Sequence, residues 1–436
     1  MHQHLPTTRT PLPATLRTTL VALALVAVAA AAGAFCTQPA GAASLPQYLQ
    51  TYKYVGQFGS HGAADGLLDF PNQITFGPNG DLYVADTHNW RIQEFMTDGM
   101  WVRSIGVTSR PDWGGGNLGF NQPQGVAVSS DRVWGVDYSS GLAWFSLTGT
   151  ALGTTSGPNA PSDLFGQPNE AAVDGQSNVY VADGGINNRV DKFDSTGAFV
   201  CQISDTALLN PVAVGVNAAG AVFVADSVGG KVLRFSPTNV ARTTYSLTAT
   251  WSAGGLSTPS SIALDSAGDV FIGDIGLGDA GQVVKLSPSG KLLARWGSSG
   301  TADGQFTFLL GVAVDPATGY VYVADRDANR IQSFQLLDRG PKTYASASLS
   351  VKKGKVVTFK YGVAEDVSAK AITSIKIKKG TTVKKTLSLG SVKCGSWLTK
   401  KWTCTLAKGS YRWYVYAKDL GGNAQVLVGS KSLTVK

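Results

Sequence analysis

The sequence predicts an all-β protein, a six-bladed β-propeller followed by a small β-sandwich. Three observations support this prediction: a phrase of two short strands around a polar turn recurs six times, 52 of the 436 residues are glycine, and long helical patterns are few. The phrase is clearest at 80–95, GDLYVADTHNWRIQEF, where 82–85 is an apolar run and 92–95 alternates apolar and polar residues. Repeats of this length are typical of radial β-architectures.

An aspartate at the end of the first strand aligns the six copies. The copies at 179–193, 222–235 and 320–334 are strong, and those at 133–145 and 270–286 are weaker. The aligned residues, spaced 43 to 51 positions apart, are Asp86, Asp137, Asp183, Asp226, Asp274 and Asp325. A further strand precedes each phrase, and another follows it after a turn. Each repeat is therefore expected to be a four-stranded antiparallel blade, and blades must stack around an axis to bury both faces.

Closure of the ring follows from the unequal ends of the repeat region. The last phrase ends at Phe334 without an outer strand, whereas the first phrase is preceded by the strand-like segment 51–58. We therefore expect 51–58 to be the outermost strand of the blade that contains 310–334. This pairing would remove a free sheet edge and lock the ring.

These motifs resemble the NHL-repeat family over roughly residues 50–340. The family pattern is P-x-G-[IV]-A-[VL]-D, then [VL]-Y-V-A-D, then N-x-R-[IV]-x-x-F, and the resemblance implies a six-bladed β-propeller. Arg91, Arg189 and Arg330 occupy the position of the family's arginine, and the fourth copy has Lys231. We interpret these arginines and Asp86, Asp183, Asp226 and Asp325 as structural residues of the repeat, in preference to catalytic ones. The aspartates would accept turn amides, and the arginines would tie each turn to its surroundings.

The N-terminal segment 1–43 is predicted to be a secretory signal peptide. Arg9 and Arg17 precede the apolar run 20–35, and the small residues 40–43 supply a cleavage site. As a transmembrane helix, the run is shorter than the roughly 20 residues that a bilayer requires. Acylation of Cys36, as in a lipoprotein, is the remaining alternative. The mature chain would then be secreted or associated with the cell surface, with no transmembrane span after cleavage.

Charge divides the mature chain into two predicted domains. Residues 44–340, the propeller, carry 16 Lys and Arg against 26 Asp and Glu, whereas 341–436 carry 19 against 3. A change of sign on this scale indicates two domains with different surroundings. The basic surface of the second domain is suited to an anionic polymer of the cell envelope.

The second domain, 341–436, is expected to be a basic β-sandwich. Strand-like segments separated by short loops lie at 347–351, 355–361, 372–378, 382–389, 411–418 and 432–435. The stretch 409–423 resembles the closing hairpin of bacterial immunoglobulin-like modules. Cys394 and Cys404 flank a short segment with two tryptophans, and we expect a disulfide between facing strands there; a zinc site would need another spacing and more ligands.

The sequence contains few residues suited to catalysis. After removal of 1–43 only His61 and His88 remain, too few for a three-histidine zinc site. We find no phosphate-binding loop, dinucleotide fingerprint or HExxH motif. No catalytic residue, metal ligand or cofactor is therefore predicted, although a weakly held cation is possible.

The two positions that follow the proline of each inner strand, or its equivalent, should surround one channel opening, because inner strands converge at the axis. Its polar members form the candidate ligand-binding set: Asn72, Gln73, Gln124, Asn169, Glu170, Ser260 and Ser261. These residues could simply satisfy strand ends and hold water. Alternatively, they form a shallow polar site for a ligand, a peptide loop or a cation.

The preferred functional hypothesis is an exported, non-catalytic binding or scaffold protein. Its propeller would recognise a protein, peptide or glycan, and its basic sandwich would attach to the envelope. The alternative is a secreted enzyme, of lyase or hydrolase type, acting at the channel mouth. Nucleic-acid binding is not expected, because export and the acidic propeller both oppose it. A sensor role would require a kinase or a second membrane span, which the sequence lacks.

Overall fold

The computed structural model describes residues 45–436 except 47, 107–119, 140, 158–162 and 277–280. The predicted signal peptide therefore lies outside the described residues. The strands of the described part form six four-stranded sheets, one three-stranded sheet and one five-stranded sheet. Its helical elements are the 3-10 turns η1 (Thr87–Asn89) and η2 (Arg326–Ala328). In these ranges no helix is long and apolar enough to cross a membrane.

Each of the six sheets is a blade whose strands are antiparallel neighbours, as the repeats predicted. The first three blades are β2 (Pro71–Phe76), β3 (Leu82–Asp86), β4 (Arg91–Phe95) and β5 (Trp101–Ile105); β6 (Pro123–Val128), β7 (Arg132–Asp137), β8 (Gly141–Ser146) and β9 (Ala151–Thr155); and β10 (Gln167–Val173), β11 (Val179–Gly184), β12 (Arg189–Phe193) and β13 (Phe199–Ser204). The next two are β14 (Pro211–Val216), β15 (Val222–Asp226), β16 (Lys231–Pro237) and β17 (Tyr245–Trp251), and β18 (Pro259–Leu264), β19 (Val270–Asp274), β20 (Gln282–Leu286) and β21 (Leu292–Trp296).

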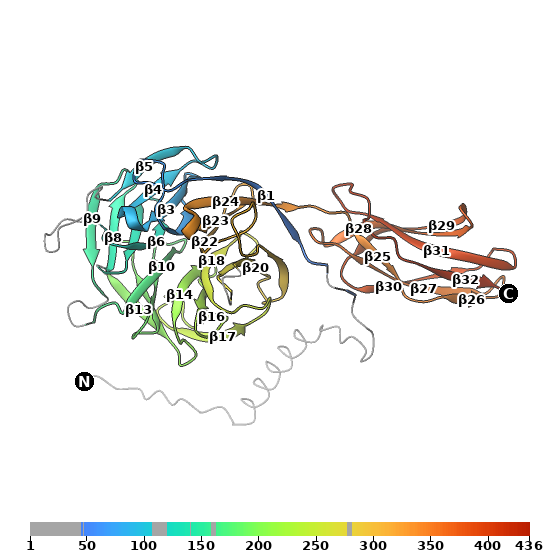
Figure 1. Ribbon diagram of the computed structural model, residues 1–436. Helices are drawn as coiled ribbons and strands as arrows, with labels where there is room; N and C mark the ends of the chain where they lie inside the picture. Colours follow the sequence, from blue (N-terminus) through green and yellow to red (C-terminus); the bar gives the residue numbers. More distant parts are fainter. Residues whose placement is uncertain (1–44, 47, 107–119, 140, 158–162, 277–280) are drawn as a thin grey trace, which may run out of the picture. The chain divides into compact units, whose positions relative to one another are not determined.

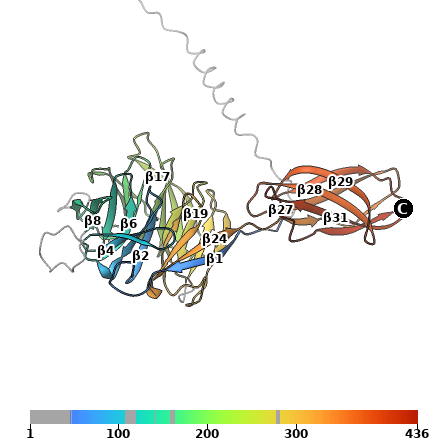
Figure 2. The same cartoon turned by 90° about the horizontal axis from the view of Figure 1, so that it is seen from above.

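The sixth blade contains both ends of the repeat region. It is formed by β22 (Leu309–Val314), β23 (Val321–Asp325), β24 (Arg330–Leu337) and, from the start of the chain, β1 (Thr51–Phe58). β1 pairs antiparallel with β24 along its length, from Thr51 opposite Leu337 to Phe58 opposite Ile331. Figures 1 and 2 both show β1 running beside β24. The predicted closure of the ring is confirmed.

The inner strands form a closed ring in the order β2, β6, β10, β14, β18, β22 and back to β2. Figure 1 shows them near the middle of the propeller, with β5, β9, β13 and β17 towards its rim. Separate clusters of buried apolar side chains lie between each pair of neighbouring blades. The apolar faces of the repeats are therefore buried where neighbouring blades stack, and the inner strands surround the central axis.

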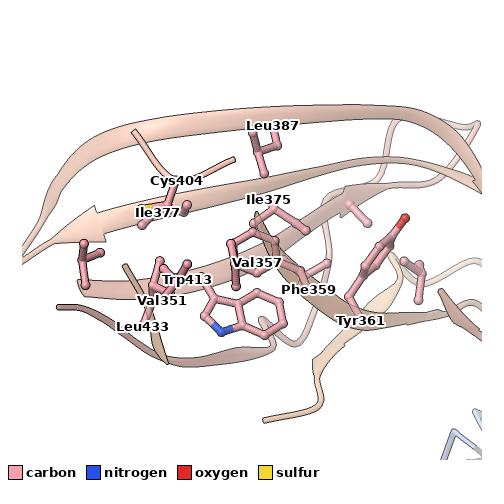
Figure 3. Close-up of a cluster of buried hydrophobic side chains, with 14 of the residues drawn as sticks. Val351, Val357, Phe359, Tyr361, Ile375, Ile377, Leu387, Cys404, Trp413 and Leu433 are labelled. Atoms are coloured by element: carbon pink, nitrogen blue, oxygen red, sulfur yellow. The ribbon is translucent and has the colours of Figure 1, made fainter. Parts of the chain in front are cut away.

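The C-terminal residues form a two-sheet β-sandwich. One sheet contains β25 (Lys342–Ala345), β27 (Val356–Ala364) and β30 (Trp397–Thr403); the other contains β26 (Leu349–Val351), β32 (Ser430–Val435), β31 (Gly409–Lys418), β28 (Lys370–Lys379) and β29 (Thr382–Lys393). Phe359 from the first sheet packs edge-on against Trp413 from the second, with ring centroids 5.0 Å apart. Figure 3 shows these two rings within the shared core. The predicted strands are present, and β25 and β30 were not predicted.

The predicted disulfide between Cys394 and Cys404 is wrong, because both cysteines are free. The residues between them form the single strand β30 instead of two facing strands. Its seven residues, at about 3.3 Å each, separate the two cysteines by roughly 20 Å, whereas a disulfide requires Cα atoms within about 7 Å. Cys404 is buried in the sandwich core, and Cys394 is half-buried at the other end of β30.

Candidate functional site at the channel mouth

The repeat aspartates fix the loops that lead into the inner strands. Asp183 accepts the backbone amides of Gly166 and Gln167 at 2.7 and 3.0 Å, just before and at the start of β10. The other five make the same kind of bond, with donors at residues 69, 121–122, 209–210, 257–258 and 307–308. Each carboxylate is fully buried. The aspartates therefore set where every inner strand begins.

The arginines of the repeat hold these aspartates in place. The Nε atoms of Arg91 and Arg330 donate to Asp86 and Asp325 at 2.9 Å. Arg189 lies 3.5 Å from Asp183 and forms a closer pair, 3.0 Å, with Asp191. Burial raises the pKa of Asp191 to about 7, and the facing Arg189 guanidinium opposes that rise. None of the six repeat aspartates and three arginines lines the hollow at the channel mouth.

Each inner strand begins with a β-bulge. The pairing between an inner strand and its neighbour shifts by one residue directly after the strand's proline, or after Leu309 in β22, as between Pro123 and Gly125 or between Pro259 and Ser261. A bulge leaves one residue outside the ladder and redirects its side chain. The residues at and beside the six bulges are those that the sequence placed around the opening.

Most of the predicted ring residues line a single hollow of about 320 Å³, called the mouth pocket here. Its lining consists of Asn72, Gln124, Asn169, Glu170, Val212, Ser227, Thr258, Pro259, Ser260, Ile275, Phe308, Leu310 and Arg326. Asn72 donates a short hydrogen bond to Gln124, which joins the first two blades at the rim. Asn169 donates to the carbonyl of Gln167 at 2.8 Å and remains half-exposed.

Gln73 and Ser261 point between inner strands and do not line the mouth pocket. Gln73 Oε1 accepts the amides of Val126 and Ala171. Ser261 Oγ accepts the amide of Val312 at 3.0 Å. Ser260 lines the pocket, but its hydroxyl contacts the carbonyls of Gly273 and Leu309. The hydrogen bonds of these three side chains therefore link the inner strands of different blades.

A close approach of backbones narrows the channel beside these residues. A Cβ atom on Gly125 would lie 2.3 Å from the carbonyl oxygen of Asn169, and one on Gly311 would lie 2.4 Å from that of Asn72. Glycine is therefore required at both positions. A second hollow of about 270 Å³ at the other end is lined by the later residues of the inner strands.

Glu170 occupies the position that holds glycine in the second and sixth blades. Its side chain lines the mouth pocket, yet the residue is only 3% exposed. No well-formed hydrogen bond reaches either carboxylate oxygen from the described residues, although the Ser261 hydroxyl and the Ile262 amide lie nearby. Burial raises the pKa of Glu170 well above its usual value, although the Ser261 hydroxyl and the Ile262 amide favour the charged form. An unpaired buried carboxyl of this kind is suited to receive a proton donor or a cation.

An aromatic and cationic wall, missed by the sequence reasoning, faces the same pocket. The guanidinium of Arg326 lies 3.9 Å from the centre of the Phe308 ring and 5.1 Å from that of Phe70. Asp327 pairs with Arg326 Nε at 2.6 Å. Ser227, Ile275 and Arg326 each follow a repeat aspartate directly. Counting one residue past each aspartate would therefore have identified them.

The two histidines predicted in the propeller lie on either side of Asp69. His61 Nε2 and His88 Nδ1 are 3.7 and 3.9 Å from the same Asp69 oxygen. His88 also stacks on Phe70, with ring centroids 4.2 Å apart. Both side chains are solvent-exposed, and neither lines the mouth pocket.

Residues 68–95 match the family model of the NHL repeat. This segment is therefore an NHL repeat. The match covers the end of the loop before β2 and the whole of β2, β3 and β4, the part of the first blade that extends from the mouth pocket to the third strand.

Two curated proteins are similar to part of this chain. Mouse peptidyl-glycine alpha-amidating monooxygenase is 39% identical over 82 residues, 18% of this chain and 8% of that protein. STRICTOSIDINE SYNTHASE-LIKE 12 of Arabidopsis thaliana is 29% identical over 177 residues, 37% of this chain and 47% of that protein. The chain thus spans less than half the length of each of these relatives.

Solved structures similar to this chain include a streptogramin B lyase, which is 14% identical in sequence. The alignment covers 66% of this chain and 98% of that chain, with a TM-score of 0.46. Another is virginiamycin B lyase from Staphylococcus aureus, with 12% identity, 66% and 100% coverage, and a TM-score of 0.45. Identities this low concern the fold alone.

Proposed function

We propose that the protein is an exported, non-catalytic binding protein that recognises its ligand in the mouth pocket of the propeller. The observation that carries this proposal is the buried carboxyl of Glu170, which lines the pocket near the Ser261 hydroxyl and the Ile262 amide but has no cationic partner in the described part of the chain. Burying such a group costs free energy unless something pairs with it. A ligand that presents a cation or a hydrogen-bond donor supplies the missing partner.

The rest of the lining suits a short peptide or a peptide loop. Gln124 and Asn169 offer amide groups at the rim, and the Phe308 ring with its stacked Arg326 offers a flat, partly apolar wall. A lysine or arginine side chain can lie along such a wall and place its charged end at Glu170. We therefore propose a basic peptide segment as the ligand class.

Peptide arrays probed with the mature chain test this proposal. The wild type should bind a subset of lysine- or arginine-containing peptides, and Glu170→Gln should lose them. Glu94→Gln is the matched control, since Glu94 is equally buried but pairs with Arg103 at 2.7 Å and does not line the pocket. Identical binding by wild type and Glu170→Gln would refute the proposal. Chemical conversion of a bound peptide would favour the alternative, a secreted enzyme acting at the mouth.

We further propose that the C-terminal sandwich attaches the protein to an anionic polymer of the cell envelope. Its support is a basic face on the outer side of β28, β29 and β31, formed by Lys370, Lys376, Lys378, Lys393, Arg412 and Lys418. Tyr414 and Tyr416 lie among these cations; Lys376 is 4.7 Å from the Tyr416 ring. Lysine charges of this kind attract a polyanion without bidentate recognition.

Retention of the mature chain on immobilised polyphosphate, used as a model polyanion, tests the attachment. The double variant Lys376→Ala/Lys378→Ala should elute at lower salt than the wild type, because exposed charges are screened over about 10 Å at 0.1 M salt. Lys352→Ala/Lys353→Ala, in an exposed turn before β27, removes the same charge elsewhere. Equal elution of both double variants would exclude the basic face as the attachment surface.

A further inference from the structure

The few acidic residues of the sandwich gather at one place. Residues 341–436 contain 19 Lys and Arg but only Glu365, Asp366 and Asp419 as acids. Glu365 and Asp366 follow β27, and Asp419 follows β31. Asp338, directly after β24, joins them. One carboxylate oxygen each from Asp338, Glu365 and Asp419 lie within 4.8 Å of one another.

Local hydrogen bonds hold these residues, called the acidic cluster here, in position. The side-chain amide of Asn423 donates to Asp338 at 3.0 Å and to Asp419 at 2.8 Å. The backbone amide of Asn423 also donates to Asp419, at 2.7 Å. The segment after Asp338 is fixed as well, because the amide of Val426 donates to the carbonyl of Pro341. The cluster is thus built by the sandwich loops and the segment that enters β25.

Asp366 gives independent evidence for a missing partner. It is only 7% exposed, and among the described residues its carboxyl has the neighbouring Glu365 carboxyl beside it but no cationic partner. Oε1 of Glu365 is buried and also lacks a cationic partner, whereas Oε2 accepts the amides of Val367 and Ser368. The Glu365 carboxyl is adjacent to that of Asp366, and like charges this close repel.

No lysine or arginine nitrogen of the described chain lies within 4.0 Å of these four carboxylates, although basic residues surround them in the sequence. Like charges held this close repel unless a cation or a proton lies between them. The donors are oxygen atoms only, contributed by three loops. Such a set suits Ca²⁺, which takes six to eight oxygen ligands, better than the strictly octahedral Mg²⁺ or a metal that prefers nitrogen and sulfur.

We propose that Asp338, Glu365 and Asp419 form a calcium site at the end of the C-terminal sandwich, with Asp366 beside Glu365 adding negative charge. Ca²⁺ would supply the missing cationic partner and tie the segment at Asp338 to the loops after β27 and β31. This site is separate from the mouth pocket and does not depend on the proposed ligand.

The test uses the mature full-length chain, freed of metal with a chelator, and CaCl₂ as the probe. Calorimetry should detect one calcium ion per chain, and millimolar CaCl₂ should raise the melting temperature of the sandwich by several degrees. NaCl at the same ionic strength should give no such rise. Absence of both the binding heat and the thermal shift would overturn the proposal.

Two variants locate the ion. Asp366→Asn and the exposed Asp338→Asn should each lower the calcium affinity by about tenfold or more, because both remove negative charge from the site. Asp338→Asn keeps the test valid if the buried Asp366→Asn fails to fold. Asp131→Asn removes an exposed propeller carboxylate and should change nothing. Calcium binding that survives Asp338→Asn and Asp366→Asn, or that is lost with Glu170→Gln, would overturn the assignment.

Discussion

The side chain of Gln73 in β2 donates a hydrogen bond of 2.8 Å to the carbonyl oxygen of Ala171 in β10. Its Oε1 atom accepts the amides of Val126 in β6 and Ala171 at 2.8 and 3.1 Å. One buried amide group therefore bridges the inner strands of three blades next to the mouth pocket. These hydrogen bonds hold the inner strands beside the mouth pocket in fixed positions, as a preorganised binding site requires.

Gln73→Leu should lower the stability of the propeller. The substitution leaves the buried amides of Val126 and Ala171 without acceptors, and each such loss costs about 1–3 kcal/mol. Chemical denaturation followed by tryptophan fluorescence measures the change. Gln124→Leu provides the control, because Gln124 bonds only to Asn72 at the rim in the described structure and should cost less than half as much. Equal losses would mean that Gln73 is no more structural than a rim residue.

Tyr52→Ala tests how much the first strand contributes to ring closure. Tyr52 in β1 stacks on Trp296 in β21 with ring centroids 4.1 Å apart, and it is only 8% exposed. Removing a buried aromatic ring costs about 3–5 kcal/mol. The melting temperature of the propeller should fall accordingly, whereas Val55→Ala, on the exposed face of β1, should leave it almost unchanged. A small effect of Tyr52→Ala would show that the ring closes without this contact.

Glu170→Gln should change how propeller stability depends on pH. The folded state raises the pKa of Glu170 above its ordinary value of 4.5, so folding takes up a proton in that range. The stability of the wild type therefore falls as the pH rises from 4.5 towards neutrality, by up to about 1.4 kcal/mol per unit of raised pKa. Glu170→Gln lacks this loss and should be the more stable protein at neutral pH. Urea denaturation at several pH values would show parallel curves if Glu170 were ionised without penalty.

Reducing agents should not change the melting temperature of the sandwich. Cys394 and Cys404 are free at opposite ends of β30, and burial raises the pKa of Cys394 to about 11, which makes its thiol unreactive. Peptide mapping without reduction should find the two residues in unlinked peptides. A linked pair would contradict the strand assignment of 397–403.

The recurring phrase was sufficient to predict the blades and their closure, because its aspartate and its apolar strands depend on local sequence. It also located Glu170 and its neighbours, since the proline near the start of five of the six inner strands marks the bulge. Arg326 was missed because the sequence analysis considered only the inner strands, whereas the turns after the second strands reach the same face. Phe308 was missed because it lies directly before the inner strand β22. The disulfide prediction is wrong because β30, which is rich in lysine and tryptophan, was not predicted as a strand.

The acidic cluster could not be predicted from sequence. Asp338, Glu365 and Asp419 are far apart in the chain, and only the pairing of the sandwich strands brings their loops together. No short motif links them, and the strongly basic composition of residues 341–436 gives no indication of an acidic cluster.

The role of Glu170 is tested most directly by calorimetry of a basic peptide selected from the array, in two neutral buffers that differ in ionisation enthalpy. Because burial favours the protonated carboxyl, binding of a cation to the wild type should release protons. Glu170→Gln should bind at least about tenfold more weakly, a loss of about 1.4 kcal/mol, and should release none. Equal affinity and equal proton release in the two proteins would contradict recognition at the mouth pocket.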